Sequence, residues 1–311
     1  MRKLFKFLSF SFLILAIIVA TFLATLFLGG FGKIPKKSEL LDLQNESASL
    51  VFANNESLIG KFFKENRTNV PYDSLPSHLV EALIATEDAR FYSHEGVDAR
   101  AMVRVFFKTI LMGDRSSGGG STLSQQLAKN LFGRKDYGKI SLGVNKLKEM
   151  VLANRLEEVY SKEEIIALYF NTVPFSENVY GIEVAAQRFF SVPVSQLKIQ
   201  QAAVLVGMLK ANTRYNPRLH PTNAKERRNV VFAQMQTYGY LDQQELDSLN
   251  ALELQLKYSN LSLNALAPYF MEELQSELKA ILHQIELKTG KAYNYKTDGL
   301  RISSTLNKNL Q

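Results

Sequence analysis

The chain has 311 residues, 46% of them hydrophobic, so it is long enough to bury a substantial core in one large domain or two. Its formal net charge of +7 suits an anionic partner such as a membrane surface, a phosphorylated substrate or nucleic acid. Because the sequence has neither zinc-finger spacing nor aromatic residues alternating with basic ones, we expect no nucleic-acid partner. The absence of cysteine excludes disulfide bonds and thiol chemistry.

The N-terminus predicts a membrane anchor. The basic stretch "MRKLFKF" leads into an uncharged run from Leu8 to Gly29, about 22 residues long, and about 20 residues suffice to span a bilayer. Such a run exceeds the apolar core of a cleaved signal peptide. We therefore predict a cytoplasmic tail at 1–7 and a transmembrane signal anchor at 8–29. Basic residues flank the run on both sides, so the expectation that the remaining chain lies outside the cytoplasm rests on its length.

The rest of the chain divides into three predicted segments. Residues 30–75 form a connector that contains a hairpin with its turn at Asn54 and Asn55. Residues 76–245 form an almost wholly helical domain. Residues 246–311 resemble a linker, a polar helix followed by a strand. Within the helical domain, residues typical of helix starts occur at Thr122, Ser161, Pro193 with Ser195, and Asn223.

The stretch "TEDARFYSHEG" at 86–96 gathers three carboxylates and a histidine directly after a predicted helix. On that helix Leu79, Leu83 and Ile84 recur at helical spacing, and Glu87 takes the next position on the same apolar stripe. Partial burial and the negative end of the helix dipole both disfavour a charged carboxylate there. Glu87 is therefore either paired structurally or poised to accept a proton, and the stretch alone favours neither reading strongly.

The stretch "GGGSTLSQQLAKN" at 118–130 predicts an anion site. Glycines that lead into a capped helix leave backbone N–H groups free at its positive end. The stretch is neither a P-loop nor a dinucleotide fingerprint, because the spacing and the preceding strand are missing. Gln126, Lys129 and Asn130 share a polar face that suits sugars and phosphates. A solvated face behind a flexible loop is the alternative.

Two further predicted helices carry charges in patterns that need an explanation. In "NKLKEM" Lys146 and Glu149 lie three residues apart on one face, which fits an ordinary surface ion pair as well as a site. In "ARAMVRVFFKTILM" Arg100, Arg104 and Lys108 recur every four residues on an otherwise apolar helix. That pattern is typical of a helix lying in a membrane interface. A buried helix whose cations reach solvent is the alternative.

Five stretches occur in the order found in peptidoglycan glycosyltransferases: "EDARFYSHEG", "GGGSTLSQQLAKN", "KLKE", "SKEEIIALYFNTVPF" with "YGIEVAAQRFF", and "LKANTRYNP". Over about residues 60–240 the sequence resembles this family, glycosyltransferase family 51, the N-terminal module of class A penicillin-binding proteins. The tail from "APYF" onward resembles the linker that leads into a transpeptidase domain. That domain is absent here, so we expect a truncated form of a longer bifunctional protein.

The resemblance implies a mechanism. Glu87 matches the general base, which takes the proton from the 4-hydroxyl of lipid II. That oxygen receives the glycan from a polyprenyl-pyrophosphate-linked donor, and a β-1,4 bond forms with inversion. Glu149 matches a second essential glutamate, which orients groups or a divalent cation (Mg or Mn) near the leaving group. Lys129, Lys146 and Lys148 would hold the leaving pyrophosphate. The remaining matches to substrate-binding positions are Asp88, Phe91, His94, Gly120, Ser121, Thr122, Gln125, Gln126 and Asn130.

The sequence also departs from the family pattern. Its third motif begins Asn145-Lys146 where Arg-Lys is usual, and about four extra residues separate it from the second motif. Glycine is usual where Ser176 stands, and glutamate where Ala167 stands. Both essential glutamates are kept, so we expect activity. The basic residue expected between the second and third motifs could be any of Arg134, Lys135 and Lys139.

By the same resemblance we expect a mainly α fold: a lysozyme-like helical glycosyltransferase domain with a membrane-associated jaw at 100–112, preceded by the transmembrane helix. The protein would be a single-pass protein of the bacterial inner (plasma) membrane with its catalytic domain outside the cytoplasm. Its expected partners are lipid II, the growing glycan, the membrane and cell-wall assembly proteins. The alternatives are a lysozyme-like enzyme that cleaves glycan and a non-catalytic cell-wall scaffold. The basic residues beside the second motif favour a pyrophosphate substrate over the first, and the two retained glutamates argue against the second.

Overall fold

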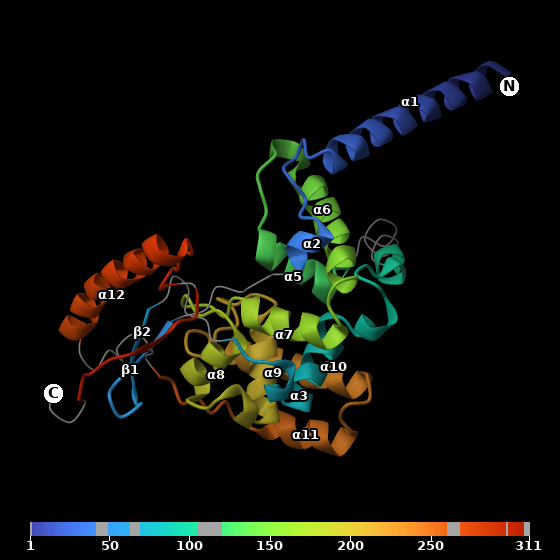
Figure 1. Cartoon of the computed structure of the whole chain (residues 1–311). Helices are drawn as coiled ribbons and strands as arrows, with labels where there is room; N and C mark the ends of the chain where they lie inside the picture. Colours follow the sequence, from blue (N-terminus) through green and yellow to red (C-terminus); the bar gives the residue numbers. More distant parts are fainter. Residues whose placement is uncertain are drawn as a thin grey trace.

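The structure, a computed structural model, describes residues 2–41, 49–62, 69–104, 120–259, 268–296 and 298–307. The molecule is mainly helical, as expected from the sequence, with a compact group of helices at its centre (Figure 1). The helices of this central body are α3 (Ser77–Glu87), α5 (Leu123–Phe132), α6 (Ser141–Glu157), α7 (Lys162–Thr172), α8 (Ile182–Phe190), α9 (Ile199–Met208), α10 (Pro221–Thr237) and α11 (Gln243–Ala251).

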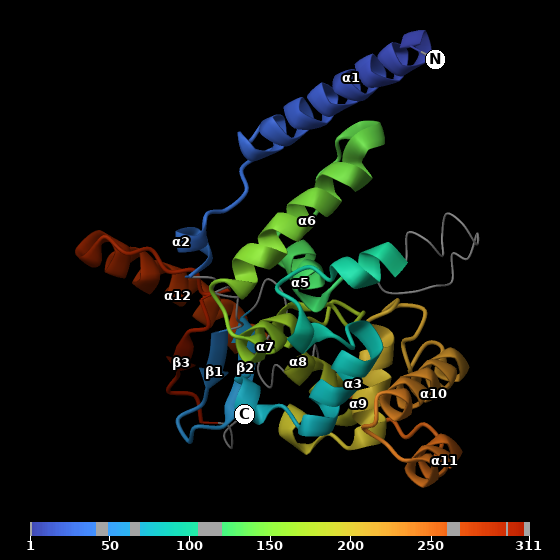
Figure 2. The same cartoon turned by 90° about the vertical axis from the view of Figure 1, so that its right-hand side faces the viewer.

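A small sheet unit lies at one edge of the helical body in both views (Figures 1 and 2). β1 (Ser49–Phe52) pairs antiparallel with β2 (Leu58–Phe62), where the sequence predicts a hairpin, and parallel with β3 (Arg301–Ser303). The long helix α12 (Pro268–Thr289) packs on this sheet. The end of the Met271 side chain lies directly against Gly60, where an added Cβ atom would be 2.5 Å from its methyl group. The β1–β2 hairpin and the C-terminal α12 and β3 thus build one unit, although the sequence suggests two separate connectors.

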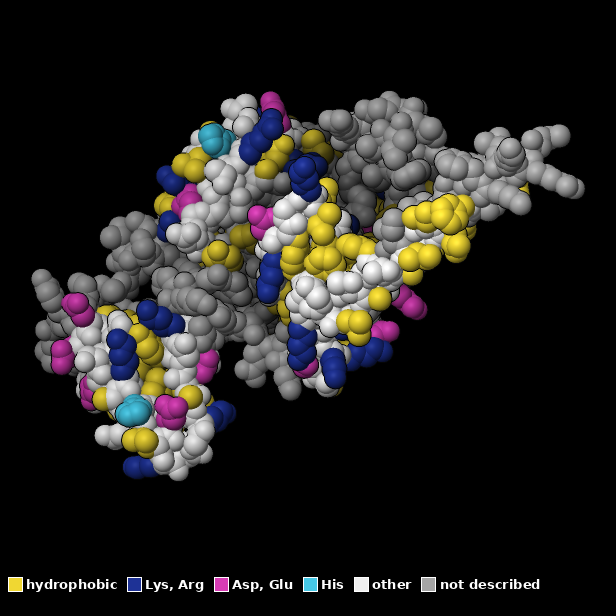
Figure 3. All heavy atoms as spheres, turned by 90° about the horizontal axis from the view of Figure 1, so that it is seen from above, with side chains coloured by type: hydrophobic (Ala, Val, Ile, Leu, Met, Phe, Trp, Pro, Cys, Tyr) yellow, Lys and Arg dark blue, Asp and Glu magenta, His cyan; other side chains and the backbone are white. Residues whose placement is uncertain are grey.

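The N-terminal helix α1 (Arg2–Phe27) projects from the body, and the short helix α2 (Lys37–Leu40) follows it. Figure 3 shows hydrophobic side chains gathered along the part of the molecule that runs toward α1. Among the described residues, no helix combines the length and the apolar character needed to cross a membrane. The signal anchor at 8–29 therefore stays a prediction. Residues 105–119, which include most of the predicted jaw helix, lie outside the described residues.

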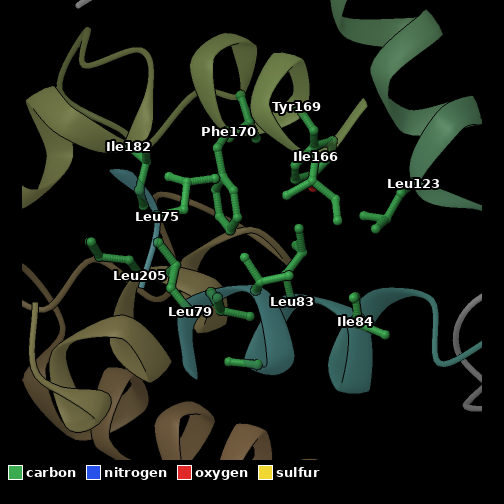
Figure 4. Packing of buried hydrophobic residues seen from close by; sticks show 14 of the residues in the cluster. Leu75, Leu79, Leu83, Ile84, Leu123, Ile166, Tyr169, Phe170, Ile182 and Leu205 are labelled. Carbon is green, nitrogen blue, oxygen red and sulfur yellow. The ribbon is translucent and has the colours of Figure 1, made fainter. Parts of the chain in front are cut away.

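The core of the helical body forms around α9. This helix is apolar on all sides, and every residue from Ala202 to Met208 is buried, as expected for a central helix. It packs against α3 and α10. Figure 4 shows Leu79 and Leu83 of α3, Phe170 of α7 and Leu205 of α9 converging in this core. The apolar stripe that precedes Glu87 is therefore what attaches α3 to the body.

Local sequence signals explain where several helices begin. Ser161 and Glu164 form the predicted capping box of α7, and Thr122 caps α5 by accepting a hydrogen bond from Gln125 N. Two predicted starts are wrong. Helix α10 begins at Pro221, before Asn223, because proline suits the first turn of a helix. Pro193 begins only a 3-10 turn, and α9 starts later, at Ile199.

Candidate active site

A cleft of roughly 410 Å³ lies between the end of α3, the entry to α5 and the exposed side of α10. Its first wall contains residues 85–90, with Glu87 among them, and its second contains Gly120, Ser121 and Thr122. The opposite wall comes from α10, where Arg227 and Gln234 face the cleft. The first and second predicted motifs therefore meet in one cavity, as their proposed chemistry requires.

Glu87 is the last residue of α3 and is partly exposed. Gln126 Nε2 donates a hydrogen bond to Glu87 Oε2 at 3.0 Å, and Tyr169 O–H donates to Gln126 Oε1 at 3.1 Å. Burial, with a further contribution from the negative charge of Glu87, raises the pKa of Tyr169 well above its ordinary value. Tyr169 therefore remains a hydrogen-bond donor, and this orients the Gln126 amide so that its nitrogen faces Glu87.

Three predicted substrate-binding residues of the first motif, one of which also lines the cleft, make structural contacts within the body. Phe91 is fully buried. Asp88 accepts hydrogen bonds from His94 Nε2 at 3.0 Å and from the backbone N–H of Leu123 at 2.9 Å. Since the Asp88 carboxylate joins the first motif to the start of α5, these residues position Glu87 relative to the glycine-rich entry. The side chain of His94 is only 4% exposed and also approaches Glu157.

The entry to α5 is similarly held in place. The Thr122 hydroxyl donates to Gly96 O, so the second motif is tied to the end of the first. Ser121 Oγ and Gln125 Oε1 both accept hydrogen bonds from Lys146 Nζ, at 2.6 Å each. Gly120 is the first described residue after the gap that precedes α5. The first turn of α5 therefore connects the cleft to α6.

A cluster of cations surrounds Glu149 on α6. Glu149 is 5% exposed, and its carboxylate accepts a hydrogen bond from Arg134 Nε at 2.7 Å and lies 3.5 Å from Lys146 Nζ. Burial lowers the pKa of Lys146, whereas the charge of Glu149 raises it, and the charges of Arg134 and Lys129 lower it further. Arg134, Lys129 and Lys146 are thus close enough to interact. Three positive charges against one negative charge leave an excess that suits an anion.

The remaining predicted contacts on α5 occupy its second half. Lys129 is exposed, and Asn130 is half-buried. Lys129 is one of the cations that act on Lys146. Of the three candidates for the basic residue between the second and third motifs, Arg134 is the one bonded to Glu149, and all three are exposed.

Lys148 does not join this cluster, contrary to the expectation from the sequence. Its Nζ donates to the carbonyl oxygens of Phe31 at 3.0 Å and Gly32 at 3.4 Å, in the segment that follows α1. Residues two apart on a helix point about 200° apart, so Lys146 and Lys148 face different neighbours. Helix α6 therefore has two polar faces, one toward α5 and one toward the segment after α1. Arg155 extends the second face by donating to Pro35 O at 2.5 Å.

The fourth motif contains a strained loop at the position where the sequence departs from the family. Ser176, Glu177 and Asn178 all have positive φ, at 76°, 52° and 57°. A glycine adopts such a conformation without the steric cost that a Cβ atom brings, which explains why glycine is usual where Ser176 stands. Glu177 accepts hydrogen bonds from Asn216, Arg218, Arg188 and Tyr258.

Sequence reasoning missed several residues of the site. Tyr169 carries a signal that could have identified it, because a buried tyrosine needs a partner for its hydroxyl. Arg104, Lys210 and Arg227 also line the cleft and give its wall a positive charge. Arg227 lies on α10, which reaches the cleft only through tertiary packing, so no local pattern places this residue beside Glu87.

Glu149 does not have the neighbours of a divalent-cation ligand. Its carboxylate is bonded by Arg134 and Lys146, and within the described residues no three histidine or acidic side chains lie together in an arrangement for a metal ion. Mg²⁺ and Mn²⁺ prefer several oxygen ligands. The donor set at Glu149 therefore does not fit a divalent cation.

A family model described as Transglycosylase matches residues 55–236. Penicillin-binding protein 1A of Escherichia coli (strain K12) is 32% identical over 279 residues, which cover 90% of this chain and 31% of that protein. Penicillin-binding protein 1F of Bacillus subtilis (strain 168) is 36% identical over 224 residues, covering 72% and 30%. Penicillin-binding protein 1A of Streptococcus oralis is 32% identical over 312 residues, covering 99% and 47%. The chain spans about a third to a half of the length of these relatives.

Proposed function

Because this chain belongs to the transglycosylase family, we propose that it polymerises the glycan strands of peptidoglycan. The donor is a growing glycan linked to a polyprenyl pyrophosphate, and the acceptor is lipid II. The reaction joins the 4-hydroxyl of the acceptor sugar to the anomeric carbon of the donor. A β-1,4 bond forms with inversion, and the lipid pyrophosphate leaves.

Glu87 is the general base of this proposal. Its carboxylate accepts the proton of the acceptor hydroxyl as that oxygen attacks the anomeric carbon. The hydrogen bond from Gln126 holds one carboxylate oxygen, Oε2, and Glu87 lines the cleft. The Tyr169–Gln126–Glu87 chain thus fixes the base before substrate arrives, and such preorganisation is a large part of enzymatic rate enhancement.

The cations near Glu149 receive the leaving group. The pyrophosphate gains negative charge as its bond to the sugar breaks, so Lys146 and Lys129 stabilise the transition state more than the ground state. Glu149 keeps the cluster from repelling itself by pairing with Arg134 and Lys146.

The observation that carries the proposal is the pair of adjacent glutamines on α5. Gln126 bonds to the base Glu87, and Gln125 bonds to the cation Lys146. Consecutive residues on one rigid helix therefore connect the proton-accepting group to the proposed pyrophosphate site. A transferase that acts at a sugar–pyrophosphate bond needs these two groups on either side of its reacting atoms.

We also propose where the protein is located in the cell and which helical fold its domain has. A lysozyme-like domain on a single-pass signal anchor in the inner membrane would hold the cleft near its lipid-linked substrates, outside the cytoplasm. The uncharged run from Leu8 to Gly29 supports this. Exposed apolar side chains also support a membrane location: Leu28, where the chain leaves α1, is 87% exposed, and Leu142, where α6 begins, is 73% exposed. The predicted jaw at 100–112 would lie in the same membrane. Cell-wall assembly proteins would be partners of the protein.

The test is to incubate the detergent-solubilised chain with labelled lipid II and to look for polymer, with Glu87→Gln as the matched variant. The substitution keeps the size and polarity of the side chain and removes the base, so polymerisation should fall by about 10²- to 10⁴-fold. A parallel incubation with preformed glycan distinguishes the glycan-cleaving alternative. Release of fragments without polymer formation, or a Glu87→Gln variant as active as the parent, would overturn the proposal.

A further inference from the structure

Four tyrosines from three separate parts of the chain gather beside the cleft. Tyr72 and Tyr92 lie in two 3-10 turns, Tyr72–Ser74 and Phe91–Ser93, and Tyr238 and Tyr240 follow the end of α10. Tyr92, Tyr238 and Tyr240 are 54%, 48% and 37% exposed, and Tyr72 is half-buried. We call these four residues the tyrosine patch. Exposed aromatic side chains that lie together mark a binding surface more often than single ones do.

Tyr92 lies at the centre of the tyrosine patch. Its ring packs at 62° against that of Phe91, with 5.4 Å between the centroids, and Phe91 is fully buried. Burial raises the pKa of Tyr92 to about 12, together with a hydrogen bond to Tyr72 and the nearness of Glu163 and Tyr240. Tyr72 and Tyr240 are therefore neighbours of a ring that is anchored on one side and open to solvent on the other.

The turn after α10 joins the tyrosine patch to the cleft. Gly239 has φ +81°, a conformation that lets the chain change direction directly after a helix. Tyr238, before this turn, lines the cleft, whereas Tyr240, after it, lies near Tyr92. The tyrosine patch is therefore continuous with the cleft that contains Glu87.

The tyrosine patch also lies away from the predicted membrane anchor. Tyr240 leads into α11, and α11 and α1 are at opposite ends of the molecule in both views (Figures 1 and 2). Tyrosine is common where proteins meet a membrane, but a surface on this side does not face the membrane in which α1 is predicted to lie. An aromatic surface that continues a sugar-binding cleft on the side away from the membrane fits a glycan.

We propose that the tyrosine patch binds the growing glycan strand, beyond the sugar that reacts. The face of a sugar ring carries C–H groups and packs on an aromatic ring, while tyrosine hydroxyls and the exposed Glu163 carboxylate bind the polar groups at its edge. Lys146, at the proposed diphosphate site, bonds to Ser121 on one wall of the cleft, and Tyr238 lies on the opposite wall. A strand held at its diphosphate can thus run past Glu87 to the patch. The inference rests on the proposed function, because it names where further sugars of the same strand bind.

The experiment compares oligosaccharides of two lengths. Binding of chitohexaose and chitobiose, soluble β-1,4-linked oligomers of N-acetylglucosamine, to the detergent-solubilised chain is measured by titration calorimetry. Only the longer oligomer reaches from the cleft to the tyrosine patch, so the parent should bind the hexamer more tightly. Tyr92→Ala and Tyr240→Ala should each lower this preference by about 3- to 10-fold, the size of one lost aromatic contact.

Two further variants are the controls. Tyr92→Phe keeps the ring and should keep most of the preference for the hexamer, which a role of the hydroxyl alone would not allow. Tyr293→Ala removes a partly buried tyrosine of the sheet unit, outside the tyrosine patch, and should not change the preference. With labelled lipid II, Tyr92→Ala and Tyr240→Ala should give shorter glycan strands than the parent. Circular dichroism shows whether each variant is folded.

A membrane contact is the competing role of this surface. Because the chain has no cysteine, Tyr240→Cys provides a single site for a thiol-reactive fluorophore, in the chain reconstituted into phosphatidylglycerol vesicles. Quenching by aqueous iodide that chitohexaose reduces would support the inference. Quenching by brominated lipid tails would place the tyrosine patch in the membrane and overturn it.

The outcomes separate this inference from the proposed function. Equal binding of the two oligomers by the parent, or a preference that Tyr92→Ala and Tyr240→Ala keep, overturns the inference even if the parent polymerises lipid II. If the parent makes no polymer but prefers the hexamer and loses this preference in the two variants, the glycan surface stands and the proposed function falls.

Discussion

Gln126 donates a hydrogen bond to the Glu87 carboxylate at 3.0 Å, so the residue proposed as base is held by a neutral amide and not by a cation. This difference matters chemically. A cation at that distance would stabilise the charged carboxylate and weaken it as a base, whereas an amide orients it at a smaller electrostatic cost. Arg134 and Lys146 pair with Glu149 instead. The two glutamates are thus held by different kinds of neighbour, as suits different roles.

Tyr169→Phe should lower kcat by roughly 3- to 10-fold while changing KM little. The hydroxyl orients Gln126, and without it the amide is free to turn its oxygen toward Glu87. Stability should fall by about 1 kcal/mol, the usual value of one hydrogen bond. Tyr160→Phe is the matched control, because its hydroxyl donates to Leu40 O, at a site that does not involve Glu87. Equal losses of kcat in the two variants would contradict the orienting role.

Lys146→Met should mainly lower turnover, whereas Lys148→Met should mainly lower thermal stability. Lys146 bonds to Ser121 and Gln125 beside the cleft, so its loss should lower polymerisation by about 10²-fold, as when one preorganised donor is removed from an active site. Lys148 bonds to the segment after α1, so its loss should leave turnover within about threefold and lower the thermal midpoint. Steady-state rates and thermal unfolding check both. A large loss of turnover in Lys148→Met with an unchanged midpoint would return Lys148 to the clamp.

Glu177→Gln should make the protein less stable at neutral pH but not in strong acid. Burial alone raises the pKa of Glu177, but hydrogen bonds from Asn216, Tyr258, Arg218 and Arg188 outweigh it and lower the pKa to about 2. Since the folded pKa lies below the ordinary 4.5, this carboxylate stabilises the fold fully above about pH 4.5 and loses that effect as pH falls toward about 2.

Urea unfolding of the parent and of Glu177→Gln across this pH range measures the effect. The difference between their unfolding free energies should shrink as pH falls. Glu226→Gln, at an exposed position of α10, is the control and should show no such trend. A difference that stays constant from pH 6 to pH 2 would show that Glu177 is not the titrating group.

Ser176→Gly should raise the free energy of unfolding by roughly 0.5–1 kcal/mol. The residue has φ 76°, where a Cβ atom is strained and glycine is not. Part of the gain is offset by the greater freedom of glycine in the unfolded chain. Ser176→Ala keeps the Cβ atom and removes only the hydroxyl, which accepts a weak hydrogen bond from Asn216 at 3.3 Å. The alanine variant should therefore be no more stable than the parent, and a gain as large as that of glycine would rule out backbone strain as the cause.

Much of the helical body follows from short-range patterns. The stripe of Leu79 and Leu83 predicts α3 and its buried face, and the capping box at Ser161 predicts the start of α7. These succeed because a helix is built from contacts three and four residues apart, which the sequence displays directly. The ordered motifs likewise point to the family and to Glu87 as the proposed base.

The sequence also predicts that Lys146 and Lys148 lie on opposite faces of their helix. Their spacing of two residues on a helix excludes a shared face, whereas the spacing of three between Lys146 and Glu149 brings that pair together. The resemblance groups Lys148 with Lys129 and Lys146, whereas the structure places its Nζ on the carbonyl oxygens of Phe31 and Gly32.

The amino-acid sequence by itself determined the helices, their buried stripes, the family and the two glutamates, because each of these depends on neighbours along the chain. Only the tertiary structure decided which cation joins Glu149, how Gln126 is oriented at Glu87, and that the strands at Ser49–Phe52 and Arg301–Ser303 pair. Arg134, Lys135 and Lys139 are equivalent as charges in a sequence. The turn places Arg134 beside Glu149, and the hydrogen bonds from Asn145 to Lys135 and Ser141 within this turn have no periodic signature.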